Sequence, residues 1–149
     1  WAMDWYYPVL SGILTGDNAL HHLTAGQKPF IMDGIGVRCV SDRPWVTTAE
    51  TCECAMAYLA AGNHQTAMDL FVWSQSMRSN EGQYLTGIVH PDGVSFPDKE
   101  HTTYSAAAVI LAADALSQAS PASSIFTHRF HLPEIIKTQA LTWEMDLDT

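Results

Sequence analysis

The sequence predicts an all-α fold, an incomplete α/α toroid of about three helical hairpins with a small β-hairpin on its rim. Three observations support this. Helix-forming stretches end at tight glycine turns, so that neighbouring helices pair as hairpins. The layout recurs, since 55 residues separate the threonine pair 47–48 from the pair 102–103. The run that follows residues 102–103 is apolar and rich in alanine, as expected for an inner helix around a common axis.

The clearest hairpin covers residues 47–78. Residues 47–61 (TTAETCECAMAYLAA) are expected to be helical, because Thr47 and Glu50 have capping-box spacing and apolar side chains recur at helical intervals. Gly62 can end this helix, and a second helix is expected over about 64–78.

The same layout precedes and follows this hairpin. A helix is expected within residues 2–14, followed at Gly16 by a short helical stretch to about residue 22. Asp4 lies twelve residues before Gly16, just as Glu50 lies twelve before Gly62. A third inner helix begins near 102–103, and its run YSAAAVILAADAL is uncharged up to Asp114, which predicts burial on most sides.

Short strand-like pieces connect the hairpins. Residues 35–40 form one, and residues 84–96 are expected to form a small hairpin around a Pro-Asp-Gly turn. Residues 1–126 are therefore assigned to the helical repeats. Residues 127–149 are assigned to a C-terminal tail, in which Pro133 can begin a short helix over about 133–143.

The chain is expected to form only half of a ring, because six hairpins at this period need roughly 300 residues. A second copy, as a homodimer, or a missing N-terminal half would complete it. The chain begins with Trp1 rather than Met, so we expect a processed product or a fragment, the C-terminal half of a longer protein.

Composition excludes several classes of function. The chain has 149 residues, 47% of them apolar, and 7 Lys and Arg against 16 Asp and Glu give a net charge of −9. Such a chain folds, but it repels nucleic acid and anionic lipid. It has no apolar run of the roughly 18 residues needed for membrane insertion. Three cysteines do not form a disulfide framework, so a cytoplasmic location is expected.

Two stretches carry a family resemblance. Residues 3–12 (MDWYYPVLSG) and 36–53 (GVRCVSDRPWVTTAETCE) resemble an uncharacterised bacterial prenyltransferase-like family, grouped with terpenoid cyclases and protein prenyltransferases. Residues 75–84 also resemble the Gln…Gly-x-Trp repeat of squalene cyclases, with Tyr84 in place of Trp. The resemblance covers about residues 1–126 and implies an α/α toroid with an isoprenoid substrate.

The catalytic motifs of those enzymes are absent from the sequence. There is no Asp-x-Asp-Asp string, and Asp, Cys and His do not occur in the context of the prenyltransferase zinc ligands. No catalytic residue is therefore transferred. Toroids of similar build, the six-hairpin glycosidases, use paired carboxylates instead.

Asp4 and Glu50 are the candidate catalytic residues, because equivalent positions in two inner helices could aim both carboxyl groups at one cavity. The alternative is that each carboxylate caps its own helix. Candidates for substrate binding are aromatic residues that could stack on sugars or shield an isoprenoid cation, together with charged loop residues: Trp5, Tyr6, Arg38, Asp42, Arg43, Trp45 and Tyr104. Core packing of the aromatics and an Arg–Asp loop contact are the alternatives.

No metal or other cofactor is predicted. Cys52 and Cys54 would point to different faces of a helix, and the pairs His90/Asp92 and His128/His131 are more typical of surface residues.

The first functional hypothesis is a prenyltransferase-like or terpenoid-cyclase-like enzyme domain that acts on a small hydrophobic or glycan substrate. The alternatives are a six-hairpin glycosidase-like carbohydrate-active domain and a non-catalytic module that binds a ligand or a subunit. An enzyme needs two ionisable groups that converge on one small volume.

Overall fold

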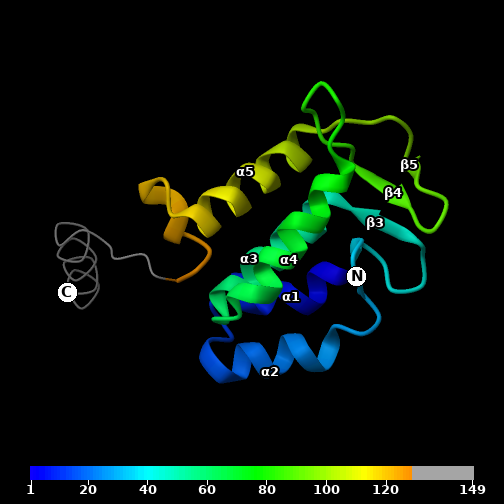
Figure 1. Cartoon of the computed structure of the whole chain (residues 1–149). Coiled ribbons are helices and arrows are strands. Elements are labelled where there is room, and N and C mark those ends of the chain that lie inside the picture. The colour runs from blue at the N-terminus through cyan, green and yellow to red at the C-terminus, as the bar shows by residue number, and fades with distance from the viewer. Residues whose placement is uncertain (129–149) are drawn as a thin grey trace, which may run out of the picture.

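Residues 1–128 are described in the computed structural model of the chain (Figure 1). Helices and short strands alternate along them, in the order α1 (Ala2–Leu10), α2 (Gly16–Gly26), β1 (Ile31–Met32), β2 (Gly36–Arg38), β3 (Trp45–Thr47), α3 (Thr48–Ala60), α4 (His64–Ser74), β4 (Gly87–Val89), β5 (Val94–Phe96) and α5 (Thr103–Ser117). Two 3₁₀ turns, Gln75–Met77 and Pro121–Ser124, follow α4 and α5.

The predicted all-α toroid is wrong, because the fold is mixed α/β. The strands form one five-stranded antiparallel sheet in the order β1-β2-β3-β4-β5. The predicted β4–β5 hairpin is present, but it is not an isolated feature of a helical rim. Strand β3 pairs with β4 through Trp45–Val89, Val46–Ile88 and Thr47–Gly87, which joins the hairpin to the sheet.

The helices begin close to their predicted places, although α5 is followed by a 3₁₀ turn and not by a second helix within the described residues. Helix α3 begins at Thr48, and Gly62, with a φ of +84°, follows its end. The Asn63 side chain then caps α4 by accepting a hydrogen bond from Thr66 N at 3.1 Å. Thr102 caps α5 in the same way, accepting from Ser105 N at 3.1 Å.

Helix α3 is the centre of the helical part. It packs against α1, α4 and α5, and every residue from Thr48 to Leu59 except Glu50 is buried. Helix α5 differs from its prediction, because only one face is buried and Ile110 is 67% exposed. Within the described residues, none of the helices is long and apolar enough to cross a membrane.

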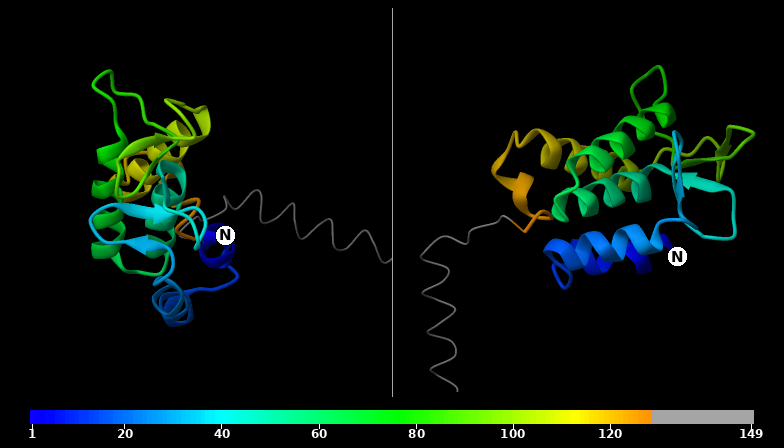
Figure 2. Two further views of the ribbon diagram at one scale, coloured as in Figure 1. Left: turned by 90° about the vertical axis from the view of Figure 1, so that its right-hand side faces the viewer. Right: turned by 60° about the horizontal axis from the view of Figure 1, so that its bottom comes forward.

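The sheet lies at one end of the helices, where α3 and α5 begin (Figures 1 and 2). The first turn of α1 reaches the same region, since Ala2 N donates to Cys39 O, just after β2, at 3.0 Å. The first turns of α1, α3 and α5 therefore converge on the sheet.

A threonine of α3 fixes the sheet to the helices. Thr51 Oγ1 accepts from Val37 N in β2 at 2.9 Å and donates to Thr47 O at 2.6 Å. Gly36, with a φ of +144°, permits this approach, because a Cβ there would lie 2.7 Å from Thr51 Oγ1. The predicted helix over 133–143 lies outside the described residues.

Candidate active site

Two cavities open beside the face of α3 that lies between α1 and α5. The first, here called the apolar cavity, has a volume of about 490 Å³ and is lined by Tyr7, Leu10, Ser11, Glu53, Met56, Tyr104, Ala107, Ala108, Leu111 and Phe126. The second, the aromatic cavity, has a volume of about 350 Å³ and is lined by Trp1, Cys39, Trp45, Thr47, Ala49, Glu50, Thr86, Phe96, Tyr104 and Ser105. Tyr104 lines both, so the two cavities adjoin at this side chain.

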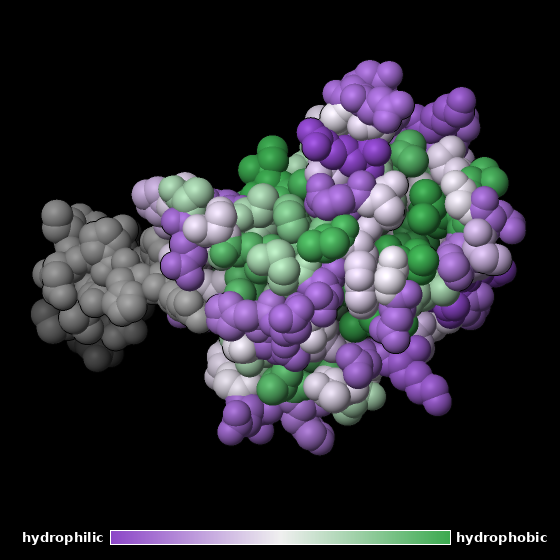
Figure 3. Space-filling model, viewed as in Figure 1, coloured by the Kyte–Doolittle hydropathy of each residue, from purple (hydrophilic) through white to green (hydrophobic). Residues whose placement is uncertain are grey.

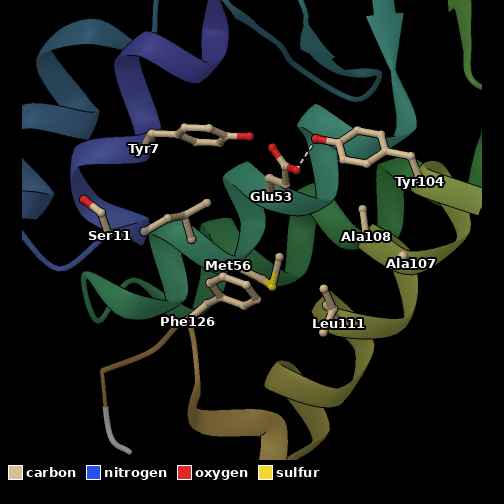
Figure 4. Close-up of a pocket in the computed structure, with 10 residues that line it drawn as sticks. Tyr7, Ser11, Glu53, Met56, Tyr104, Ala107, Ala108, Leu111 and Phe126 are labelled. Carbon is tan, nitrogen blue, oxygen red and sulfur yellow. Dashed lines mark hydrogen bonds between the residues drawn. The ribbon is translucent and has the colours of Figure 1, made fainter.

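Glu53 is held between helices by two phenol groups. Its side chain accepts a hydrogen bond from the Tyr6 hydroxyl at 2.5 Å and another from the Tyr104 hydroxyl. The hydroxyl of Tyr7 also points toward it (Figure 4). Burial and the charge of Glu53 raise the pKa of both Tyr6 and Tyr104, so the two phenols remain protonated hydrogen-bond donors.

Glu50 lies one turn earlier on α3, in the aromatic cavity. Burial raises its pKa above the ordinary value of 4.5, and the nearby charge of Glu53 adds to the rise, whereas the Thr47 hydroxyl opposes it. Thr47 precedes α3 without capping it through its side chain, so the predicted Thr47–Glu50 capping box does not form. A carboxyl group in such an environment holds its proton more tightly than an exposed one.

Aromatic rings form one wall of the aromatic cavity. Trp45 of β3 stacks on Phe96 of β5 with ring centroids 4.5 Å apart and planes 14° apart. The Arg43 guanidinium lies 5.8 Å from the centroid of the Trp45 ring. Stacked rings beside a carboxyl group are a common way to bind the flat face of a sugar.

The structure separates the two sequence-predicted carboxylates. Asp4 lines neither cavity, and its side chain is 77% exposed with Oδ2 3.0 Å from the amino group of Trp1. Glu50 instead lies one turn before Glu53 on α3, and Glu53 is not among the residues predicted from the sequence. An acidic residue inside the otherwise apolar run of α3 was the signal that could have identified it.

The predicted binding residues divide into three groups. Trp45 and Tyr104 line the cavities, and Tyr6 is buried but reaches the site through Glu53. Trp5 belongs to the core, stacked on Phe30 with centroids 5.4 Å apart. The charged residues contact one another or neighbouring parts of the sheet and its loops. Arg43 Nε lies 4.0 Å from Asp42 Oδ1, and Arg38 donates to Met32 Sδ at 3.0 Å and Ser41 O at 3.4 Å.

The cysteines do not form a metal centre or an activated nucleophile in the part of the chain that the structure describes. No group of three or more metal-ligating side chains occurs among residues 1–128. Cys39, Cys52 and Cys54 are buried free thiols, and burial raises the pKa of both Cys39 and Cys52 to about 11. Thiols with such a pKa are poor nucleophiles near neutral pH. His131 lies outside the described residues.

Comparison with known proteins finds a carbohydrate-active relative. A protein of Mycolicibacterium hassiacum named MMP endo-(1,4)-3-O-methyl-alpha-D-mannosidase is 47% identical to this chain over 126 residues. The matched region is 85% of this chain but 35% of the relative, so the chain spans about a third of the relative's length. No protein-family model matches the chain.

These findings correct the family resemblance. A mannosidase relative and a five-stranded sheet contradict the prenyltransferase-like and terpenoid-cyclase-like identification, and with it the expected isoprenoid chemistry. The relative supports a glycosidase-like function, which was the alternative hypothesis.

Proposed function

We propose that this chain provides the catalytic groove of a glycosidase-like enzyme that hydrolyses α-(1,4)-linked mannosides. The single observation that supports it best is the position of Glu50 and Glu53 one turn apart on α3, each lining one of two cavities that adjoin at Tyr104. Residues three apart on a helix have Cβ atoms about 5–6 Å apart. Side chains that begin this far apart can bring their carboxyl groups to the separation of about 5–9.5 Å that glycosidases use.

The two carboxyl groups have different environments, and hydrolysis needs two different roles. Glu50, whose pKa is raised, donates its proton to the glycosidic oxygen as the bond from that oxygen to the anomeric carbon breaks. Glu53, fixed by Tyr6 and Tyr104, stabilises the positive charge that develops at this carbon. Water then attacks the carbon and gives a proton to Glu53, and proton exchange with solvent restores both groups.

The aromatic cavity supplies the sugar-binding surface. Trp45 and Phe96 offer a stacked apolar face beside Glu50, on which the less polar side of a mannose ring can lie. The linkage and the sugar in this proposal come from the name of the relative, and the residue roles come from the cavities of this chain.

The test is the release of new reducing ends from α-(1,4)-linked mannooligosaccharides with 3-O-methyl groups by the full 149-residue chain. We expect Glu50→Gln to lower kcat by about 100-fold or more, the usual contribution of a general acid. Glu81→Gln is the matched control, because Glu81 is exposed and lines neither cavity. Absence of cleavage by the wild-type chain would contradict the proposal, whether or not the chain binds mannosides.

Two further variants test whether Glu53 or Asp4 is the second carboxylate that acts with Glu50. Glu53→Gln should reduce cleavage strongly, whereas Asp4→Asn should have a small effect, because Asp4 is exposed outside both cavities. The reverse result would return Asp4 to the catalytic pair and remove Glu53 from it.

A further inference from the structure

We infer that the apolar cavity is the subsite that receives the methyl ether of an O-methylated mannoside and makes the site prefer methylated over unmethylated sugar. This inference rests on the proposed function, because it assigns a substrate feature to the same groove. It adds which part of this chain receives the methyl group, and the name of the relative gives no such residues.

The lining of the apolar cavity is divided by chemistry. Glu53 and the hydroxyls of Tyr7 and Tyr104 gather at one end, while Met56, Leu111 and Phe126 surround the other (Figure 4). Ser11 also lines the cavity, away from Glu53, and its hydroxyl donates to Pro8 O at 3.3 Å. A sugar that reaches Glu53 would therefore keep its reacting carbon at the polar end. A substituent on its ring would point toward carbon and sulfur atoms.

Such walls discriminate between a hydroxyl and a methyl ether. A free hydroxyl placed against Met56, Leu111 and Phe126 would lose its water and gain no hydrogen-bond partner from them, which opposes binding. A methyl ether has no proton to donate and adds apolar surface that the cavity removes from water. The volume of about 490 Å³ lies in the range of sites for small organic ligands.

The alanines of α5 create the space in this cavity. Ala107 and Ala108 line it with single methyl groups, where longer side chains would project into the volume. Two neighbouring residues further along α5 provide a test position and its control. Leu111 lines the cavity, whereas Ile110 is 67% exposed to solvent outside it.

The occupant to which the inference commits is a methyl ether on mannose. The name of the relative includes a 3-O-methyl sugar, and the carboxyl pair beside the cavity suits a glycoside rather than an acyl chain. Apolar residues are also exposed on the outer surface, among them Met68, Val72 and Val94, and green patches appear on the face shown in Figure 3. Those residues line neither cavity.

The experiment compares two α-(1,4)-linked mannooligosaccharides that differ only in 3-O-methylation, with kcat/KM as the readout. The wild-type chain should prefer the methylated substrate by about tenfold or more, which is the usual effect of one methyl group in an apolar pocket.

Ala107→Leu fills the cavity and Leu111→Asn makes its wall polar, so each should reduce the preference at least about fivefold. Ile110→Asn should leave it unchanged. Because Leu111 is partly buried, thermal melting checks that its variant folds, and Ala107→Leu provides the second test.

Binding separates a failure of this inference from a failure of the proposed function. Methyl 3-O-methyl-α-mannoside and methyl α-mannoside are titrated against chain labelled at the methionine methyl groups, with Met56→Leu to assign the Met56 signal. A shift of that signal by the methylated sugar alone, without hydrolysis, would support the subsite and contradict the proposed function. Hydrolysis without methyl preference, or a preference that persists in both cavity variants, would overturn the subsite alone. No shift with either sugar and no hydrolysis would overturn both.

Discussion

Glu50 and Glu53 lie three residues apart on α3, and their surroundings give them different properties. Glu53 is 9% exposed and accepts hydrogen bonds from two phenols, which fix its position. Glu50 is partly buried, and its pKa is raised. A hydrolase needs such a difference. One carboxyl group must hold a proton that it can donate to the leaving group, and the other must be ionised to stabilise positive charge.

Glu50 should cost the protein stability at neutral pH. Because its pKa is raised in the folded state, the folded chain holds the proton more tightly than the unfolded chain, and stability falls as the pH rises from about 4.5 through the raised value. Glu50→Gln cannot ionise, so urea unfolding should show it to be more stable than the wild type at pH 7 and equally stable at pH 4. An equal difference at both pH values would contradict the burial argument.

The two phenols that hold Glu53 should contribute unequally. Tyr6 is fully buried, so Tyr6→Phe leaves a buried carboxylate without one of its donors and should lower the free energy of unfolding by about 2 kcal/mol. Tyr104 is 51% exposed, and water can replace its hydroxyl, so Tyr104→Phe should cost less than about 1 kcal/mol. Chemical denaturation of both variants measures the difference, and equal losses would contradict it.

Part of the candidate site could be predicted from the sequence. Glu50, Trp45 and Tyr104 were selected because they precede or begin inner helices, and all three line a cavity. Glu53 was not selected, because its position does not recur in the other hairpins and its partners Tyr6 and Tyr104 are 47 and 51 residues away. Contacts at such separations leave no local pattern in the sequence.

At the scale of elements, the helices were predicted better than the sheet. Helix α3 has a cap position, a glycine stop and apolar spacing over 13 residues, so its period can be recognised in the sequence. The strands have two or three residues each, which is too short to show an alternating pattern. Trp45–Thr47 is a strand because it pairs with residues 87–89, which are 40 to 44 positions away.

The contact between β2 and α3 should be a major link between the sheet and the helices. Thr51→Val keeps the shape of the side chain but leaves the buried Val37 N without its acceptor, so it should lower the free energy of unfolding by about 1–3 kcal/mol.

Thr24→Val is the matched control, because the exposed Thr24 hydroxyl only donates to Leu20 O within α2. It should change stability by less than about 0.5 kcal/mol. Similar losses in the two threonine variants would show that the β2–α3 hydrogen bond has no special importance.

For the whole molecule, the candidate site joins parts that are distant in sequence. The walls of the two cavities come from α1, α3, α5 and the sheet. A ligand bound in either cavity would therefore connect these elements, whereas a ligand on one exposed helix would not.

Mannoside binding should stabilise the whole fold. At a concentration 100 times its Kd, a ligand that binds only the folded chain adds about 2.7 kcal/mol. Thermal unfolding with a 3-O-methylated mannooligosaccharide should thus shift to higher temperature, and amide exchange should slow in the first turns of α3 and α5. Protection confined to one of these helices would contradict a groove that spans them.

The hydrogen bonds of Glu53 also determine when the site can form during folding. Tyr6, Glu53 and Tyr104 come from near the start, the middle and near the end of the described chain, so the arrangement is complete only after long loops have closed. A nascent chain that has emerged from the ribosome only as far as α4 would contain both glutamates but no Tyr104 to hold Glu53. The arrangement of hydrogen bonds around Glu53 would therefore be complete only after α5 has docked on α3.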